Sequence, residues 1–385
     1  MRILYHHRIA SKDGQYVHIS AIVTALRKLG IELQIVCPAL SEAQRFGGEV
    51  TMVAALRQRL PKVLYEFLEL GYSAVDFVKL VAAIIRFKPD IIYERYNLFF
   101  PSGVIAGKLF NVPLILEVNA PLYDERSKYG GLRLAKLARW TERYVWRNAD
   151  FVLPVTRVLA DRVAQEGVRP QVIEVIANGV DEAQFCAEIG AKHVFSSPPG
   201  RVMVGFVGFC REWHELDKII ELIAEDKSQK LDFLIVGDGP VIHGLRAQAA
   251  RLGCEDRVHF TGLVAREDIP RWLAVIDIAI QPAVVPYASP LKLIEYLAAG
   301  KAIVAPAQAN IRELLTHEKN ALLFPEGSPD QLVAAVRRLA SDEKLRERLA
   351  LAAKRTIQEK SLLWDENARR IVALGDRLCA SKPSE

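Results

Sequence analysis

The stretch SPLKLIEYLAAGKAIVAP, residues Ser289 to Pro306, predicts a short helix that leads into a buried strand. Ser289 can accept an amide hydrogen bond as the N-cap, and Pro290 suits the first helical position, where no N–H is needed. Gly300 ends the helix. The apolar run KAIVAP that follows is typical of a strand inside a parallel sheet.

Lys292 and Glu295 lie inside this helix and need an explanation. A lysine in the first turn is disfavoured by roughly 0.3 to 1 kcal/mol, because it sits beside the positive end of the helix dipole. One interpretation is a Lys292–Glu295 pair at i, i+3, which contributes only about 0.2 to 0.5 kcal/mol. The other is a nucleoside diphosphate: free amides and an ammonium bind its phosphates, and Glu295, one turn further along the same face, accepts from the ribose hydroxyls. This stretch alone leaves both interpretations open.

The composition is that of an ordinary globular protein. Of 385 residues, 51% are hydrophobic and 25% are charged, and a net charge of +5 does not by itself indicate nucleic acid. No run reaches the roughly 18 apolar residues of a membrane span, and the N-terminus lacks the apolar core of a secretory signal, so we expect a cytoplasmic protein. The five scattered cysteines include no C-x-x-C pair and indicate neither a disulfide framework nor a zinc site.

The first half of the chain alternates short apolar runs with helical patterns. The expected strands are MRILY, IELQIVC, DIIYE, VPLILEV, DFVLPV and QVIEVI, and the expected helices lie near residues 18–29, within 62–87 and from about 130 to 147. Strands that are apolar throughout and separated by helices predict a parallel sheet covered on both faces.

A second series of the same kind follows the break FSSPPG at residues 195–200. Its expected strands are RVMVGFVG, KLDFLIVGDG, DRVHFTG, IDIAIQP and KAIVAP. We therefore predict an α/β protein with two doubly wound, Rossmann-like domains, residues 1–185 and 186–360, and a C-terminal helix in 361–385 that returns to the first domain. Ligands of such sheets collect at the carboxyl ends of the strands, so we expect the site in a cleft between the domains.

Five segments occur in the order and spacing of one family: ANGVDEAQF, GFVGFCREWHELDKIIE, LIVGDGP, VHFTGLVAREDIPRWLAVIDIAIQP and the opening stretch. On these segments the chain resembles the retaining glycosyltransferases of family 4, or glycosyltransferase group 1, which have the GT-B fold. The resemblance covers essentially the full length and is strongest from Asn178 to Phe324. It implies that residues 1–185 bind the acceptor and residues 186–360 bind the nucleotide sugar.

The resemblance also implies roles for individual residues. Glu295 matches the second glutamate of the family's E-x(7)-E motif, which binds the ribose. Val264 matches the position that holds the base through its backbone, and Gly14 matches the first loop, which approaches the diphosphate and the acceptor. The implied donor site comprises Gln15, Phe209, His214, Gly237, Val264, Tyr287, Ala288, Ser289, Pro290, Leu291 and Glu295, and the implied catalytic residues are Gly14, Asn119, Arg211 and Lys292.

Several positions depart from the family's pattern. Tyr287 replaces the first glutamate of E-x(7)-E, so that residue's contact with the donor sugar is lost or replaced. Phe209 and His214 stand where the family has an arginine and a lysine on the phosphates, and we assign that role to Arg211; the alternative for Arg211 is a solvated loop charge. Asn119 stands where many members have a histidine, and an amide cannot act as a general acid.

Glycosyl transfer builds negative charge on the departing β-phosphate, so catalysis needs preorganised donors there. The chain contains no D-x-D motif, which predicts a reaction without metal, and no cofactor is expected. The resemblance implies retention by front-face attack, which needs no enzyme nucleophile. We expect a hexose donor such as UDP-glucose and a glycan or lipid-linked sugar acceptor in polysaccharide synthesis.

The segment LRLAKLARWTERYVWR predicts a basic amphipathic helix. Its basic residues fall within about a 120° arc at 100° per residue; they are Arg133, Lys136, Arg139, Arg143 and Arg147. Such a helix can lie on anionic lipid, which would place the protein on the inner face of the membrane. The alternative is that its apolar side packs on the sheet while its basic side is merely solvated.

Three rival functions share features with this sequence. A dinucleotide-dependent dehydrogenase is disfavoured, because Ile242 stands where the third glycine of the fingerprint should be. A UDP-sugar epimerase of the GT-B fold would share the nucleotide site but needs acid and base carboxylates that the sequence does not identify. A non-catalytic subunit that binds a nucleotide sugar stays open because of Tyr287 and Asn119.

Overall fold

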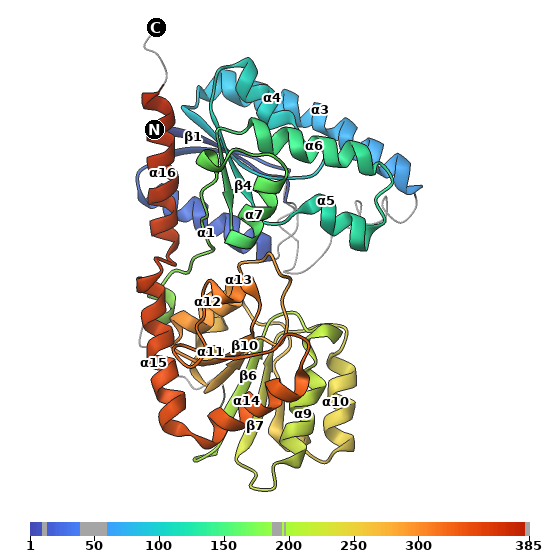
Figure 1. Cartoon of the computed structure of the whole chain (residues 1–385), viewed down its shortest axis with the longest axis vertical. Helices are drawn as coiled ribbons and strands as arrows, with labels where there is room; N and C mark the ends of the chain where they lie inside the picture. The colour runs from blue at the N-terminus through green and yellow to red at the C-terminus, as the bar shows by residue number, and fades with distance from the viewer. Residues whose placement is uncertain (10–13, 39–59, 187–194, 196–197, 382–385) are drawn as a thin grey trace. The chain divides into compact units, whose positions relative to one another are not determined.

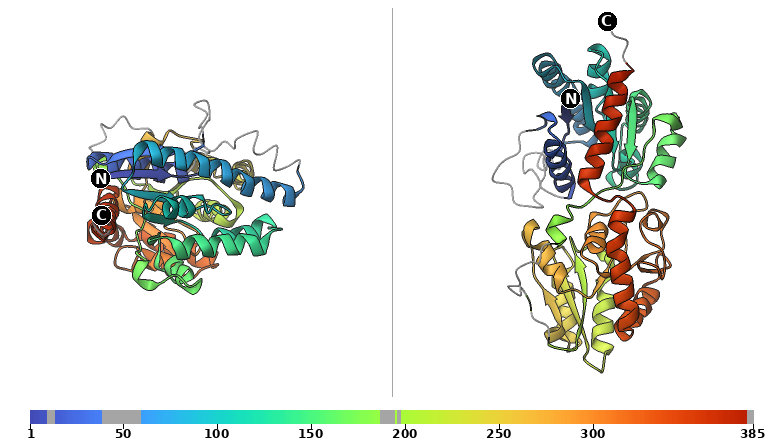
Figure 2. Two further views of the ribbon diagram at one scale, coloured as in Figure 1. Left: turned by 90° about the horizontal axis from the view of Figure 1, so that it is seen from above. Right: turned by 90° about the vertical axis from the view of Figure 1, so that its left-hand side faces the viewer.

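The computed structural model describes residues 1–9, 14–38, 60–186, 195 and 198–381, which fold into two compact units (Figures 1 and 2). Unit 1 comprises Met1–Asn178, Tyr287–Ser289 and Trp364–Glu385, and unit 2 comprises Gly179–Pro286 and Pro290–Leu363. Each unit has one parallel sheet with helices around it, which confirms the predicted fold class.

The sheet of unit 1 has five strands in the order β2-β1-β3-β4-β5. The strands are β1 (Arg2–His6), β2 (Glu32–Val36), β3 (Ile91–Arg95), β4 (Leu114–Val118) and β5 (Phe151–Pro154). Strands β3 and β4 are buried at every position. This is the reason that their sequences are apolar throughout instead of alternating.

Helices cover both faces of this sheet. They are α1 (Gly14–Lys28), α3 (Lys62–Phe87), α4 (Ser102–Leu109), α5 (Leu122–Glu125), α6 (Ala135–Asn148), α7 (Arg157–Gln165) and α16 (Trp364–Ala380). Figure 1 shows α1 and α16 together on one side and α3, α4 and α6 on the other. The helix expected from residue 130 begins at Ala135, because a π-helical turn at Arg126–Gly130 and the left-handed Gly131 precede it.

The sixth strand expected in the first half, QVIEVI, is not a strand. The segment follows β5 through two backbone hydrogen bonds, from the amides of Glu174 and Ile176. Side chains of α16 take its other groups: Arg370 pairs with Glu174 at 3.0 Å and donates to the carbonyl of Val175 at 2.8 Å. The segment shares only an isolated bridge with β5, between Val152 and Ile173, and most of its residues are half-buried, so the expected sixth strand is not formed.

The sheet of unit 2 has six strands in the order β11-β10-β9-β6-β7-β8. The strands are β6 (Val202–Val207), β7 (Leu231–Val236), β8 (Val258–Phe260), β9 (Ile278–Ile280), β10 (Ala302–Pro306) and β11 (Leu322–Phe324). The five runs predicted in this half are all strands. The three-residue β11 was not predicted.

Helices also cover the sheet of unit 2. They are α8 (Ala183–Cys186), α9 (Leu216–Glu225), α10 (Ile242–Arg251), α11 (Ile269–Ala274), α12 (Leu291–Ala298), α13 (Ala309–Arg312), α14 (Pro329–Ser341) and α15 (Glu343–Glu359). In unit 2, α12 packs on α15, and α9 packs on α10. No helix in the described part of the chain is long and apolar enough to cross a lipid bilayer.

Candidate functional site

Two glycine loops meet at the carboxyl ends of β6 and β7 in unit 2. A Cβ on Gly237 would lie 2.2 Å from the carbonyl oxygen of Gly208, and one on Gly239 would lie 2.1 Å from that of Cys210. Gly208 and Gly237 also have positive φ angles, which L side chains rarely adopt. Any side chain at these positions would force the loops apart. The glycine predicted for the donor site, Gly237, is therefore needed to keep the two strand ends in contact.

Lys292, in the first turn of α12, reaches into this junction. Its Nζ lies 4.0 Å from the ring centre of Phe206, and a Cβ on Gly208 would be 2.8 Å from it. Burial lowers the pKa of the Lys292 ammonium to about 8, although Cys210 and Glu295 partly offset this. Among the described residues, no carboxylate lies within ion-pair distance of it. A half-buried cation without a counterion is costly, which favours a bound anion at this place.

Glu295 does not pair with Lys292, so the i, i+3 explanation for the two residues is wrong. The carboxylate is buried, and its Oε1 accepts from Nη2 of Arg266, which lies on the 3₁₀ turn Arg266–Asp268. Oε2 has no hydrogen bond with the described residues. Arg266 was missed by the sequence reasoning, because the two residues are 29 positions apart and no local pattern joins them.

Ser289 is not the N-cap of α12. Pro290 occupies that position with extended dihedrals, and the helix begins at Leu291. The hydroxyl of Ser289 accepts from the backbone amide of Asn178 at 3.1 Å, and its carbonyl accepts from Nδ2 of Asn178 at 2.6 Å. No side chain caps α12. The amide of Leu293 donates to the carbonyl of Pro290 at 3.1 Å, which leaves the amides of Leu291 and Lys292 available to a ligand.

The loop after β6 holds Arg211 above two aromatic rings. Its guanidinium carbon lies 4.5 Å from the ring centre of Phe209 and 5.5 Å from that of Trp213, and both rings are exposed. The amide of Arg211 donates to Nδ1 of His214 at 3.1 Å. Burial, with Lys292 and Arg211, lowers the pKa of His214 to about 3. His214 is therefore neutral near pH 7, and the cation of this loop is Arg211.

The remaining donor-site residues follow two other strands of unit 2, β8 and β9. Val264 is half-buried in the loop after β8, and Ala288 and Leu291 are half-buried on either side of Ser289 and Pro290. Gly14 is exposed at the first position of α1. The candidate residues thus lie at two places, one in unit 2 around Lys292 and one in unit 1, to which the segment Tyr287–Ser289 also belongs.

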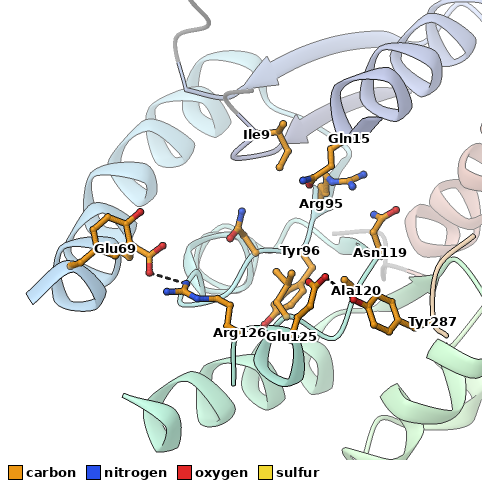
Figure 3. Close-up of a pocket in the computed structure, with 13 residues that line it drawn as sticks. Ile9, Gln15, Glu69, Arg95, Tyr96, Asn119, Ala120, Glu125, Arg126 and Tyr287 are labelled. Carbon is orange, nitrogen blue, oxygen red and sulfur yellow. Dashed lines mark hydrogen bonds and ion pairs between the residues drawn. The ribbon is translucent and has the colours of Figure 1, made fainter. Parts of the chain in front are cut away.

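The place in unit 1 is a pocket of about 550 Å³ that thirteen residues line (Figure 3). Three of them, Gln15, Asn119 and Tyr287, were predicted site residues. Charged and amide side chains surround the space, and the guanidinium of Arg126 donates to Glu69 at 2.8 Å. Paired charges and amides in a pocket of this size suit a polyhydroxylated ligand better than an apolar one.

Glu117, near the end of β4, holds two residues that line this pocket in place. It is buried and accepts from Tyr93 at 2.7 Å, from Arg95 at 2.6 Å, from Nε2 of His18 at 3.1 Å and from the amide nitrogen of Asn119. Burial alone would raise the pKa of Glu117, but His18 and Arg95 hold it well below its usual range. The carboxylate therefore stays ionised and fixes both Arg95 and Asn119, which line the pocket.

Tyr287, which stands where the family's motif has a glutamate, makes two hydrogen bonds within unit 1. Its hydroxyl donates to Oε1 of Glu125 at 2.6 Å, and its carbonyl accepts from the hydroxyl of Thr156, the N-cap of α7, at 2.9 Å. A carboxylate is thus present beside Tyr287, but α5 supplies it. The loss of a glutamate at this position does not remove a carboxylate from the pocket.

Several pocket residues escaped the sequence reasoning. Arg95 is the last residue of β3 and Asn97 lies two residues after it, so the rule that ligands collect at strand ends could have found them. Glu69 lies in α3 and Arg126 in the π-helical turn, and the two form an ion pair at the pocket. No sequence signal singles them out, because the pairing spans 57 residues.

The basic side of α6 is only partly solvated. Arg139 lies 3.5 Å from the carboxylate of Glu166, Arg143 binds the same carboxylate more closely, and Arg162 of α7 lies 2.5 Å from it. Arg147 donates to the carbonyl of Glu166 at 2.6 Å. Burial raises the pKa of Glu166, but hydrogen bonds from Arg143 and Arg162 outweigh it and lower the pKa to about 2. Of the residues predicted to meet lipid, Arg139 and Arg143 bind the buried carboxylate of Glu166, whereas Arg133 and Lys136 are exposed.

Two parallel α/β units of this kind define the GT-B glycosyltransferase fold. The crystal structure of the Anabaena protein HepE in complex with UDP superposes with a TM-score of 0.72 at 21% identity and covers 97% of this chain and 99% of its own. The model for glycosyl transferases group 1 matches residues 191–356, and the model for glycosyltransferase family 4 matches residues 12–184. The chain therefore belongs to the group 1, family 4 glycosyltransferases, as its motifs predicted.

Curated relatives span nearly the same length. A 2-deoxystreptamine glucosyltransferase of Streptomyces kanamyceticus is 25% identical over 348 residues, 85% of this chain and 89% of the relative. A GDP-mannose-dependent alpha-mannosyltransferase of Mycobacterium tuberculosis is 27% identical over 360 residues, 91% of this chain and 89% of the relative. These relatives differ in the sugar named in their descriptions, so membership of the family does not fix the donor.

Proposed function

We propose that this glycosyltransferase moves a hexose from a nucleotide diphosphate sugar to a glycan or lipid-linked sugar, with retention of the anomeric configuration and without a metal ion. The observation that carries the proposal is the half-buried ammonium of Lys292, which no described carboxylate balances, at the glycine junction of β6 and β7. A diphosphate would supply the missing negative charge.

The chemistry needs donors aimed at the leaving β-phosphate. Lys292 and Arg211 contribute two cations, and the uncapped amides at the start of α12 contribute aligned dipoles. Because these groups stabilise the developing charge directly, the proposed mechanism requires no bound metal. Glu295 would hold the ribose through Oε2, with Arg266 fixing the other oxygen.

UDP is the proposed nucleotide and glucose or a close relative the proposed sugar. HepE has been solved with UDP-glucose, and the Streptomyces kanamyceticus relative is described as a glucosyltransferase. The acceptor would occupy the pocket of unit 1, where Asn119, Arg126 and Glu125 offer hydrogen bonds of both polarities to sugar hydroxyls. Asn119 carries an amide, so the proposed mechanism has no general acid at this position.

The test is the affinity for UDP of the Lys292→Met variant, measured by calorimetry. Losing a charged hydrogen bond of about 1.5 to 3 kcal/mol should weaken binding roughly 10- to 150-fold. Lys301→Met is the matched control: burial likewise lowers the pKa of Lys301 to about 8, but its ammonium donates to the carbonyl of Ala274. Equal affinity in wild type and the Lys292 variant, or equal loss in both variants, would contradict the proposal.

A non-catalytic nucleotide-sugar-binding subunit remains the second candidate, because Tyr287 and Asn119 replace residues that the family uses at the donor sugar. Radiolabelled UDP-glucose incubated without acceptor separates the two candidates. Slow release of free glucose supports an enzyme, and the configuration of that glucose, read by NMR before mutarotation, tests retention. Release unaffected by a chelator is expected for a reaction that needs no metal.

A further inference from the structure

The outward side of α3 is apolar. Seven of the seventeen large hydrophobic side chains exposed in the described part of the chain belong to this one helix, with exposures from 42% to 65%. They are Val63, Leu64, Phe67, Leu68, Val75, Val78 and Ile85, which we call the apolar face of α3. A concentration of this kind on one element marks an interaction surface, whereas single exposed hydrophobic residues do not.

The acidic side chains of α3 face the interior instead. Glu66 is buried and accepts from the backbone amides of Arg133 at 2.9 Å and Leu134 at 2.6 Å. Asp76 is buried beside His6 at 2.8 Å, and Glu69 is paired with Arg126 in the pocket of unit 1. A surface helix normally turns its polar side to water. Helix α3 does the opposite: its acidic side chains point inward and its apolar face is exposed.

The charges that α3 exposes are all basic. Lys62, Lys79 and Arg86 lie on the exposed side of the helix, and Lys88 follows its last turn. With no exposed carboxylate between them, they give the apolar face a positive border. An apolar stripe with only basic charges beside it is complementary to anionic lipid headgroups and the acyl chains below them.

We propose that the apolar face of α3 lies on an anionic lipid bilayer. From Leu64 to Ile85 the face is roughly 32 Å long at 1.5 Å per residue, and it would lie along the bilayer surface. Hydrophobic side chains would enter the boundary between headgroups and acyl chains, while Lys79 and Arg86 would bind lipid phosphates. The charge pattern disfavours a second copy of the chain as the occupant, because the basic borders of two such helices would repel each other.

The position of α3 connects this surface with the acceptor. Tyr65 and Glu69 of α3 line the pocket of unit 1, where Figure 3 shows Glu69 beside Arg126. Leu64 and Leu68 of the same helix belong to its apolar face. If the proposed transfer to a lipid-linked sugar holds, α3 would keep the pocket beside the bilayer that contains the acceptor. This last link rests on the proposed function, whereas the lipid contact does not.

The experiment is co-sedimentation of the full chain with vesicles of phosphatidylcholine alone and with vesicles in which a third of the lipid is phosphatidylglycerol. We expect binding mainly to the anionic vesicles. Val75→Gln/Val78→Gln should weaken it roughly tenfold or more, because two exposed apolar side chains are lost. Lys79→Gln/Arg86→Gln should weaken it about 30-fold, at about 1 kcal/mol per cation, and only on the anionic vesicles.

The matched control is Leu252→Gln/Leu351→Gln, which removes two exposed leucines from unit 2 and should leave binding unchanged. Absence of wild-type binding, or equal binding by the α3 variants, would overturn the proposal. So would a concentration-dependent dimer that Val75→Gln/Val78→Gln abolishes, or vesicle binding gained only when residues 39–59 are deleted. The UDP affinity of every variant should equal that of wild type, so failure on lipid leaves the proposed transfer reaction intact.

Discussion

The half-buried Lys292 and the buried His6 differ in how the cost of removing a cation from water is offset. Lys292 keeps no described counterion, and burial lowers its pKa to about 8. His6 lies between Glu94 at 2.6 Å and Asp76 at 2.8 Å, and these carboxylates outweigh the effect of burial and raise its pKa to about 9. The first arrangement leaves room for an anionic ligand, whereas the second is internally satisfied and holds the fold together.

The raised pKa of His6 makes the stability of unit 1 depend on pH. A folded-state pKa above the unfolded value of 6.5 contributes stability that is fully present below pH 6.5 and is lost as the pH rises through 9. The loss should amount to roughly 3 kcal/mol by linkage. Thermal unfolding of wild type should therefore weaken between pH 7 and pH 10 more steeply than that of His6→Gln. Parallel pH profiles for the two proteins would rule out this contribution.

At the scale of elements, the hydrogen bonds and ion pairs around His6 join two helices to two strands. Asp76 of α3 accepts from the hydroxyl of Ser102, and Glu94 of β3 lies directly over Gly103, at the start of α4. Helices α3 and α4 are thereby tied to the ends of β1 and β3 through one imidazole. The elements were predicted individually from their periodicity, but this link was not, because its members lie 88 residues apart.

The packing of α4 on β3 leaves no room for a side chain at Gly103. A Cβ there would lie 1.7 Å from Oε2 of Glu94, so Gly103→Ala must displace the carboxylate from His6. We expect a loss of about 1 to 3 kcal/mol in the free energy of unfolding. Gly71→Ala in α3 is the control, since nothing lies within 4 Å and the change should stabilise by about 0.5 to 1 kcal/mol. Urea unfolding of both variants checks the prediction, which equal effects would contradict.

At the scale of the whole molecule, the last helix belongs to the first unit. Helix α16 packs on α1, and its Ile371 and Leu374 are buried in unit 1. The ring of Trp364, its first residue, lies 4.9 Å from that of His18. The end of the chain therefore contributes to the stability of the domain that contains its beginning.

Ile371→Ala should destabilise unit 1 by about 2 to 5 kcal/mol, because it opens a cavity in a buried contact. Arg369→Ala, on the exposed side of the same helix, should change stability by less than about 0.5 kcal/mol. Hydrogen exchange can separate the units: protection of α1 should fall in the Ile371 variant, while that of α9 in unit 2 should not. Equal loss of protection in both units would mean that α16 does not act through unit 1.

The sequence by itself determined the α/β class, ten of the eleven strands in the described residues, and the family, because apolar periodicity and short motifs are local properties. It also singled out Lys292 as a cation in an unfavourable place. Only the tertiary structure decided that Glu295 binds Arg266, that Glu166 gathers the arginines of α6, and that α3 turns its acids inward and its apolar side out. These pairings join residues that are distant in the chain, and the direction a helix faces depends on the neighbours that bury it.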